Sequence, residues 1–365
     1  MAQMQGGNIS FRPSLPVRGK LKLVQWLTAL TGCTLVGAAC NSPAEPRRSG
    51  CDPSYEFIAD RVRAIEYDLQ LRGVALLVVR DGRTLCEMYS GQHQPDTRVA
   101  LLSAVKWLTA ITIMTVVDEK KLSLDTRVAA LIPTFTKDKG AVTLRQLLSH
   151  TSGLQSEAPC MTNRNISLAN CADSIGLAPS ETPPGAFFAY AGSPFTVAGR
   201  MAEIASGKSW EQLFTERVVL PLGLEGTGYG AQQNPILDAG YAYGTLRDYA
   251  RVLQMLRDGG AYAGRRVLSQ QALTEMFRDQ TGGVKSLFPP RDTGTCYGLG
   301  VWCEGIRADG TVFRVGSPGA TGVIPWLDLD QGVIGLFVTN TPFDDVHTRV
   351  GALKDEIRDS IARRR

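Results

Sequence analysis

The sequence predicts an α+β fold in which a mostly antiparallel sheet is flanked by terminal helices and an all-helical lobe is inserted into the chain. Three observations lead to this prediction: apolar runs of strand length lie near both ends, apolar residues recur at helical spacing in the middle, and short turns join the strands. Short connections favour antiparallel neighbours, because parallel strands need long crossovers. With 365 residues, 44% of them hydrophobic, the chain is long enough to bury a substantial core.

The folded part is expected to open with a helix and a hairpin. The pattern predicts a helix over residues 55–72, and the apolar run at residues 74–80 has the length of a strand. Asp81-Gly82 is a strong signal for a two-residue hairpin turn. Residues 84–89 are therefore expected to form the returning strand.

Helical spacing dominates the middle of the chain, and strands return near its end. Helices are expected at residues 103–119, 143–148, 194–204, 210–218, 246–256, 270–277 and 347–363. Strands are expected at residues 298–303, 311–315, 319–327 and 332–340. The sequence thus predicts a single domain over residues 51–365, with an α/β lobe at about 51–98 and 290–365 and a helical lobe at about 99–289.

Residues 1–50 are expected to be an export signal and a linker. Basic residues between positions 12 and 22 precede an apolar run at residues 23–39, which ends in small residues just before Cys40. The order basic, apolar, small is typical of a secretory signal. The run is short for a membrane span, which needs about 20 apolar residues, and a single-span anchor stays open as the alternative.

Two cysteines leave the processing of this signal open. Leu30-Thr31-Gly32-Cys33 resembles a bacterial lipobox, and residues 36–40, ending in Cys40, resemble a looser one. Lipidation at Cys33, lipidation at Cys40 and simple cleavage are all compatible with the sequence. In each case we expect an exported protein of the bacterial periplasm or cell envelope. If Cys33 or Cys40 carries a lipid, the protein is expected to be a membrane-anchored lipoprotein.

Six further cysteines follow the signal, and an even number beyond an export signal predicts disulfides. Proximity in the sequence pairs Cys160 with Cys171 and Cys296 with Cys303, which leaves Cys51 with Cys86. Other pairings stay open at this point. A zinc site is disfavoured, because no C-x-x-C occurs and no histidine lies near a cysteine pair. No metal is therefore expected.

Charge and motif content argue against several classes of protein. The net charge is only +4, without the clustered Lys and Arg of a nucleic-acid-binding face, so no nucleic-acid partner is expected. The sequence contains no G-x-S-x-G, Walker, G-x-G-x-x-G or H-E-x-x-H motif, and no cofactor is expected. The histidines, His93, His150 and His347, are widely separated. A Ser-His-Asp triad is therefore poorly supported.

Ser103 and Lys106 form the candidate catalytic pair. Side chains three residues apart on a helix share one face, with Cβ atoms about 5–6 Å apart. A serine hydroxyl is a weak nucleophile until a base takes its proton, and a lysine in a dry pocket near another cation can lose its charge and act as that base. Ser103 is the only serine with a lysine three positions on. The plain alternative is a helix N-cap serine with a solvated lysine.

From residue 54 to the C-terminus, the sequence resembles the serine β-lactamase and penicillin-binding protein superfamily, most closely the class C-like branch that includes the family VIII carboxylesterases. The most specific match is TLRQLLSHTSGL at residues 143–154, against the L-L-x-H-T-S-G-L segment of that branch. Residues 210–224 resemble the family's helix and P-L-G-M turn, and residues 319–322 and 338–340 resemble its last two strands. The resemblance implies a β-lactamase/transpeptidase-like fold and an acyl-transferring serine hydrolase.

The resemblance also implies roles for individual residues. Ser103 and Lys106 match the nucleophile and the base. The second motif of the family is usually Tyr-x-Asn, and PGAFFAYAG at residues 184–192 matches it, so Tyr190 corresponds to the catalytic tyrosine. Its phenol would share a proton with Lys106 and then protonate the leaving group. Gly192, which is expected to line the substrate site, stands where the family has asparagine.

The third motif departs further from the family. Where relatives have Lys-Thr-Gly or His-x-Gly, this chain has Ser317-Pro318-Gly319, of which Ser317 and Gly319 are the expected substrate-binding residues. No cation is present there to hold a substrate carboxylate, and Pro318 removes a backbone donor. The backbone N–H groups of Ser103 and Ala320 are expected to form the oxyanion hole, which needs preorganised donors and no particular side chain.

The sequence therefore favours a carboxylesterase-like serine hydrolase that acts through an acyl-enzyme on an ester, lactone or amide, with a small-molecule acyl substrate as its partner. One alternative is a β-lactamase or D-alanyl-D-alanine carboxypeptidase, for which Arg314 or Arg291 would supply the missing cation. Another is a non-catalytic envelope binding protein on a degenerate hydrolase scaffold. His150 is expected to be structural, with its imidazole capping a turn.

Overall fold

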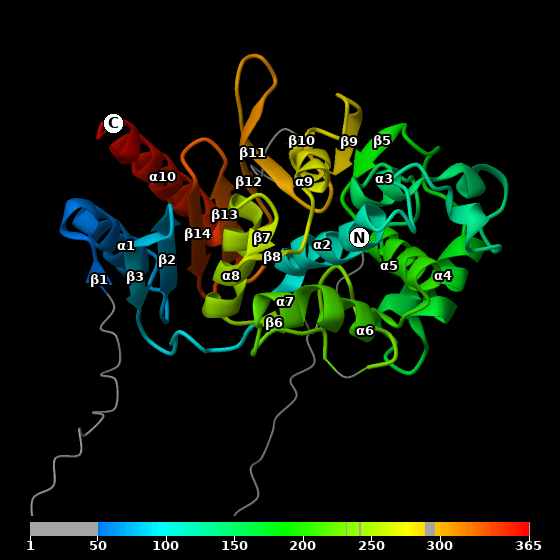
Figure 1. Cartoon of the computed structure of the whole chain (residues 1–365), viewed down its shortest axis with the longest axis horizontal. Coiled ribbons are helices and arrows are strands. Elements are labelled where there is room, and N and C mark those ends of the chain that lie inside the picture. Colours follow the sequence, from blue (N-terminus) through cyan, green and yellow to red (C-terminus); the bar gives the residue numbers. More distant parts are fainter. Residues whose placement is uncertain (1–49, 231, 241, 289–295, 365) are drawn as a thin grey trace, which may run out of the picture. The chain divides into compact units, whose positions relative to one another are not determined.

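The computed structural model describes residues 50–230, 232–240, 242–288 and 296–364. The main sheet of these residues has eight strands: β1 Gly50–Cys51, β2 Ala75–Arg80, β3 Arg83–Tyr89, β10 Cys296–Tyr297, β11 Trp302–Ile306, β12 Val312–Gly316, β13 Val323–Asp328 and β14 Val333–Val338. Their order is β1-β3-β2-β14-β13-β12-β11-β10, and every neighbouring pair is antiparallel (Figure 1). The predicted α+β fold with an antiparallel sheet is confirmed.

Both faces of the central strands are buried. In β14, Ile334 and Leu336 belong to one hydrophobic cluster, whereas Val333 and Phe337 belong to the other. Alternate residues of a strand point to opposite faces. The central strands are therefore continuous apolar runs in the sequence, because neither face of the sheet is exposed to solvent there.

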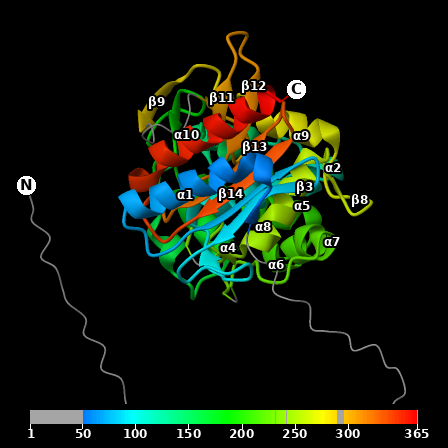
Figure 2. The ribbon, with the colours of Figure 1, turned by 90° about the vertical axis from the view of Figure 1, so that its left-hand side faces the viewer.

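Helices α1 (Glu56–Asp68) and α10 (Phe343–Ala362) lie side by side across one face of the sheet (Figure 2). They bury Ile58 and Val62 from α1 and Val350 from α10 in the same cluster as Phe337. Helix α8 (Leu246–Arg257) packs on β13 and β14 from the other side. The sheet is thus a middle layer between helices, as expected for an α+β domain.

The remaining helices lie between β3 and β10 in the chain. They are α2 Val105–Asp118, α3 Leu144–Leu148, α4 Leu168–Leu177, α5 Ser193–Ser206, α6 Trp210–Phe214, α7 Leu220–Leu222 and α9 Gln270–Phe277, with a π-helical turn at Thr215–Val219. Helix α2 is buried at every position from Val105 to Val116. A helix that is apolar on all sides belongs in the centre of a core, and α2 carries Lys106 into it.

Short pairs of strands accompany these helices. They are β4 Val99–Ala100 with β6 Tyr243–Gly244, β5 Phe187–Ala189 with β9 Lys285–Phe288, and β7 Ala261–Tyr262 with β8 Arg265–Arg266. The β5–β9 pair is parallel. Strand β5 ends immediately before Tyr190, so this short pair fixes the backbone that leads into the predicted catalytic tyrosine.

The hairpin predicted at Asp81-Gly82 is confirmed, and both of its residues have positive φ, as such a turn requires. The strand predicted at residues 298–303 is wrong at its start, because β11 begins only at Trp302. Gly300 has φ +77° and approaches α2 so closely that a Cβ would lie 2.9 Å from the Lys106 carbonyl oxygen. This segment therefore turns instead of extending.

The structure contains the three disulfides expected from sequence proximity, Cys51–Cys86, Cys160–Cys171 and Cys296–Cys303. Disulfides persist in oxidising compartments, which indicates an extracellular or periplasmic protein. Among the described residues, no helix is both long and apolar enough to cross a membrane. The expected export signal, with Cys33 and Cys40, lies outside the described residues.

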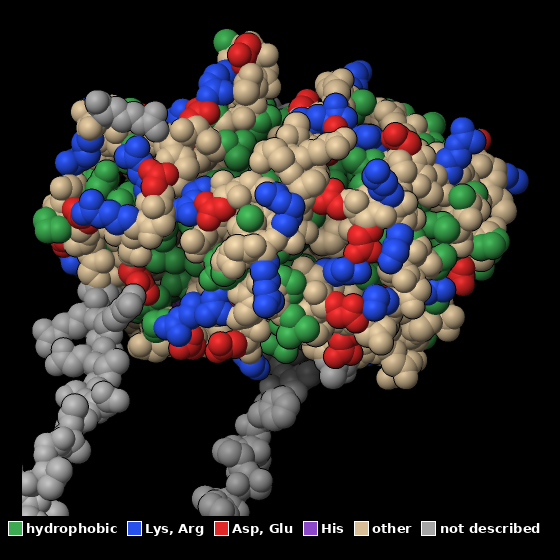
Figure 3. All heavy atoms as spheres, viewed as in Figure 1, with side chains coloured by type: hydrophobic (Ala, Val, Ile, Leu, Met, Phe, Trp, Pro, Cys, Tyr) green, Lys and Arg blue, Asp and Glu red, His purple; other side chains and the backbone are tan. Residues whose placement is uncertain are grey.

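Basic and acidic side chains are interspersed over the face of the molecule shown in Figure 3. Exposed ion pairs of the described residues include Arg61 with Glu356 and Arg63 with Asp60. Exposed pairs of this kind contribute little to stability, because water and salt screen them. Buried charges are therefore better indicators of function in this protein.

Candidate active site

Ser103 lies in a short 3₁₀ turn, Leu102–Ala104, that leads directly into α2. Leu102 has φ +44°, a left-handed conformation that is unusual for a residue other than glycine and is often found at functional sites. The turn is fixed from α8, because the Tyr249 hydroxyl donates a hydrogen bond of 2.8 Å to the Ala104 carbonyl oxygen. Ser103 is half-buried and sits at a helix start, where backbone N–H groups lack partners within the helix.

Lys106, one turn further along, is buried in the core with only 2% of its surface exposed. Its Nζ donates to the Asp238 carbonyl oxygen at 2.7 Å and lies 3.4 Å from Asp238 Oδ2. The same ammonium group lies 4.6 Å from the ring centroid of Tyr190 and 5.7 Å from that of Phe195. Such distances allow cation–π attraction. The Lys106 ammonium group thus lies between Asp238 and the rings of Tyr190 and Phe195.

This environment corrects one expectation about Lys106. The sequence led us to expect a base in apolar surroundings, but the structure also places a carboxylate beside Lys106. Burial lowers the pKa of Lys106, whereas Tyr190 and the Asp238 carboxylate raise it, and the net result is a pKa above its ordinary value. A raised pKa keeps Lys106 in its ammonium form.

Tyr190 follows β5 and packs against an aromatic group. Its ring centroid lies 4.5 Å from that of His150 and 5.2 Å from that of Trp302. Ala191 N–H donates to His150 Nδ1 at 3.2 Å, so the imidazole holds the backbone that follows Tyr190. Burial, together with the charge of Lys106, lowers the pKa of His150 well below its ordinary value, which keeps the ring neutral. These contacts agree with a structural role for His150.

The third-motif stretch lies against the Ser103 turn. Ser317 Oγ donates to the Ser103 carbonyl oxygen at 3.4 Å. A Cβ on Gly319 would lie only 2.2 Å from the Leu101 carbonyl oxygen, so glycine is what permits this approach. Ala320 follows and is exposed. The stretch contains no charged side chain.

Gly192 lies against Asp238 and Met161. A Cβ on Gly192 would lie 2.5 Å from Asp238 Oδ2 and 2.4 Å from the end of Met161. The space that a side chain at position 192 would need is therefore occupied by Asp238, which also binds Lys106. The structure thus brings Lys106, Tyr190 and Gly192 together, and it places Ser317 and Gly319 beside Ser103.

Of the two arginines considered for a substrate carboxylate, Arg314 is already bound to acidic side chains. Arg314 Nη1 binds Asp355 Oδ1 at 2.7 Å, and its Nε lies 3.8 Å from Glu304 Oε2. Asp355 belongs to α10, so this guanidinium is engaged under the helix layer of the sheet. Arg291 lies outside the described residues. Over the residues described, no group of three or more His, Cys, Asp or Glu is arranged to hold a metal ion.

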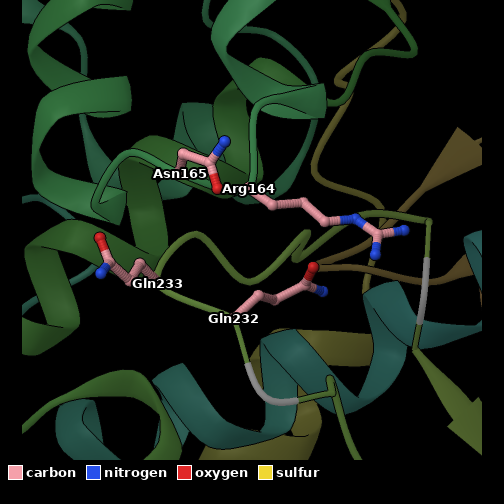
Figure 4. Close-up of a pocket in the computed structure, with 4 residues that line it drawn as sticks. All are labelled: Arg164, Asn165, Gln232 and Gln233. Carbon is pink, nitrogen blue, oxygen red and sulfur yellow. The ribbon is translucent and has the colours of Figure 1, made fainter.

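A polar pocket of about 360 Å³ opens on the helical part of the molecule (Figure 4). It is lined by Arg164, Asn165, Gln232 and Gln233, and the side chains of Arg164 and Gln232 extend in the same direction along it. The loop that begins with Gln232 and Gln233 continues to Asp238, whose carbonyl oxygen binds Lys106. The pocket and the Lys106 cluster thus share the loop at residues 232–238.

Comparison with known proteins shows the family. Residues 58–356 match the family model described as beta-lactamase, and the chain belongs to this family of β-lactamase-fold serine hydrolases. It is 29% identical, over 77% of its length and 84% of the relative, to penicillin-binding protein 4 of Amycolatopsis lactamdurans.

Solved structures agree with this assignment. A putative beta-lactamase from Bacteroides dorei is 32% identical, with a TM-score of 0.72 over 78% of this chain and 90% of that one. A family VIII carboxylesterase has a TM-score of 0.64 over 80% of this chain and 93% of that one. At 20% identity, the carboxylesterase supports the fold alone.

Asp238 and Glu157 were not predicted from the sequence. Glu157 lies near the same cluster: burial and the Asp238 carboxylate raise its pKa, while the charge of Lys106 lowers it. No local motif surrounds either residue in the sequence. The one available signal was the glycine at position 192, which implied that another group fills the place of the usual asparagine.

Proposed function

We propose that the protein is a serine hydrolase that transfers acyl groups from an uncharged ester, lactone or amide to water through Ser103. The observation that carries the proposal is the position of the Lys106 ammonium, which is buried between Asp238 and the Tyr190 ring one helical turn from Ser103. A buried charge held against a phenol beside a candidate nucleophile is typical of an acid–base site.

In the proposed mechanism, Tyr190 reacts as a phenolate, whose negative charge is stabilised by the Lys106 ammonium, and its oxygen accepts and returns the proton. Ser103 Oγ attacks the substrate carbonyl carbon and passes its proton to the Tyr190 oxygen. The tetrahedral oxyanion is held by the N–H groups of Ser103 and Ala320. Collapse releases the alcohol or amine, which takes the proton from Tyr190. Water then attacks the acyl-enzyme by the same steps and restores the Ser103 hydroxyl.

The preference for an uncharged substrate rests on the third-motif stretch. Ser317, Pro318 and Gly319 lie against the Ser103 turn and carry no charge. A carboxylate bound there would lose water without gaining a cation, which is costly in a partly dry site.

The test uses the full chain with its disulfides oxidised, together with p-nitrophenyl acetate and butyrate. Nitrophenol release and intact mass are followed in the same samples. Ser103→Ala should lower kcat by at least about 10³-fold and abolish an acyl adduct on the protein. Tyr190→Phe removes only the hydroxyl and should lower kcat by about 10²–10⁴-fold. Ser174→Ala and Tyr262→Phe, which change the same groups elsewhere, should remain active.

Benzylpenicillin separates the proposal from the closest alternative. The similarity to penicillin-binding protein 4 favours testing a β-lactamase or D-alanyl-D-alanine carboxypeptidase activity. We expect little acylation of Ser103 by this carboxylate-bearing substrate. Stoichiometric acylation would replace the esterase proposal with that alternative. A folded protein with neither turnover nor adduct would instead favour the non-catalytic binding protein.

A further inference from the structure

We infer that Asp238 is a positioning residue of this site, because its carboxylate fills the space of the side chain that position 192 lacks and holds Lys106 against Tyr190. The inference rests on the proposed function, because its test measures ester hydrolysis at this site. It assigns a role to a loop residue that lies 132 positions from Lys106 in the chain.

Positions 192 and 238 are sterically coupled. Asp238 Oδ2 would lie 2.5 Å, and its Cγ 2.8 Å, from a Cβ placed on Gly192. Real Cβ contacts are longer than this, so a side chain at position 192 and the present Asp238 rotamer exclude one another. The other close atom is Met161 Cε at 2.4 Å, the free end of a flexible side chain that can move. A side chain introduced at position 192 therefore requires Asp238 to move.

Four titratable groups act on Lys106 or on its neighbours. Tyr190 comes from the end of β5, and together with Asp238 from the loop before β6 it raises the pKa of Lys106. His150 follows α3, and Glu157 interacts electrostatically with both Lys106 and Asp238. His150 is neutral. Asp238 is the carboxylate in direct contact, at 3.4 Å, and its side chain is only 8% exposed. Its charge is therefore poorly screened by water and strongly favours the ammonium form.

The loop that carries Asp238 is held rigidly, as a positioning residue requires. Thr109 Oγ1, one turn beyond Lys106 on α2, donates to the Leu237 carbonyl oxygen at 2.5 Å. Asn234 Nδ2 donates to the Cys160 carbonyl oxygen at 2.9 Å. Leu237 is fully buried. The loop is thus tied to α2 on one side and to the Cys160–Cys171 disulfide region on the other.

The first experiment compares pH profiles of kcat/KM for p-nitrophenyl butyrate in the full chain. Asp238→Asn keeps the shape and removes the charge, so Lys106 should lose its proton at lower pH. The alkaline limb should move down by about 1–3 pH units, the effect of an opposite charge at this range. Asp238→Glu should keep the limb near its original pH. Asp173→Asn on α4, which removes a charge but keeps an acceptor for the Thr134 hydroxyl, should leave the profile unchanged.

The second experiment tests the steric coupling and covers the case in which Asp238→Asn fails to fold. Gly192→Asn alone should lower kcat/KM by at least about 10-fold, because its side chain displaces Asp238. Gly192→Asn combined with Asp238→Gly should recover at least half of that loss on a logarithmic scale. Independent, additive effects in this cycle, or an unmoved alkaline limb in Asp238→Asn, would overturn the inference. Activity that survives Ser103→Ala would overturn the proposed function instead.

Discussion

Gly319→Ala is expected to push the third-motif strand entry away from the nucleophile turn. The new Cβ would lie 2.2 Å from the Leu101 carbonyl oxygen, whereas an ordinary contact begins at 3.4 Å, so one backbone segment has to move by about 1 Å. That oxygen also accepts the 3.0 Å hydrogen bond from Ala104 N–H that shapes the turn at Ser103. The proposed oxyanion hole, formed by the N–H groups of Ser103 and Ala320, would therefore widen.

Two measurements can detect this displacement. Overpacking of this kind lowers the free energy of unfolding by about 1–3 kcal/mol, measured by urea denaturation. A misplacement of about 1 Å near reacting groups lowers kcat by about 10²-fold, measured by ester hydrolysis. Gly351→Ala in α10 is the matched control, because a Cβ there meets nothing within 4 Å. A glycine-to-alanine change inside a helix should raise stability by about 0.5–1 kcal/mol.

The reasoning would be refuted by a Gly319→Ala protein that unfolds like wild type and keeps its kcat within about twofold. Loss of stability with unchanged kcat would refute only the link to the oxyanion hole. Loss of kcat without loss of stability would indicate that the strand entry moves easily and that the site alone is sensitive to the displacement.

Three further outcomes are expected. Replacing Cys51 and Cys86 by serine opens a loop with a sequence separation of 35 and should lower the free energy of unfolding by about 4 kcal/mol, measured in urea against the oxidised wild type. The pKa of His150 is depressed in the fold, so the neutral ring stabilises the protein fully above the unfolded pKa of about 6.5, and this contribution should fall by about 1.4 kcal/mol per pH unit below it. In His150→Gln, the free energy of unfolding measured in urea should therefore change less steeply between pH 5 and pH 7 than in wild type. An equal pH dependence would contradict the assignment. Glu304→Ala should cost about 3–5 kcal/mol, because it strands the buried Lys354 that it binds at 2.8 Å, and adding Lys354→Met should recover much of that loss in the same assay.

The sequence predicted the architecture well wherever local patterns carried the information. The hairpin at Asp81-Gly82 and helix α9 at Gln270–Phe277 follow from turn chemistry and helical spacing, which depend on neighbours in the chain. The strand predicted at residues 298–303 was wrong at its start, because Gly300 turns to fit against α2. A close approach to a distant helix leaves no periodic signal in the sequence.

The features of the candidate site also fall into two groups: those that a local motif predicts, and those that depend on contacts between distant segments. The spacing of Ser103 and Lys106, the position of Tyr190 and the uncharged Ser317-Pro318-Gly319 stretch could all be read from motifs, because each motif is contiguous in the chain. The charge state of Lys106 could not be predicted from any motif. Its sequence neighbours are apolar, and the two groups that raise its pKa, Tyr190 and the Asp238 carboxylate, belong to segments far away in the chain.

By itself, then, the sequence determined which residue types are available and which of them share a helix face or a turn. The tertiary structure alone decided that Asp238 occupies the space beside Gly192, and that Tyr190 and Asp238 together raise the pKa of Lys106. The physical reason is that a pKa depends on burial and on charges within a few ångströms, and these are set by how separate segments pack.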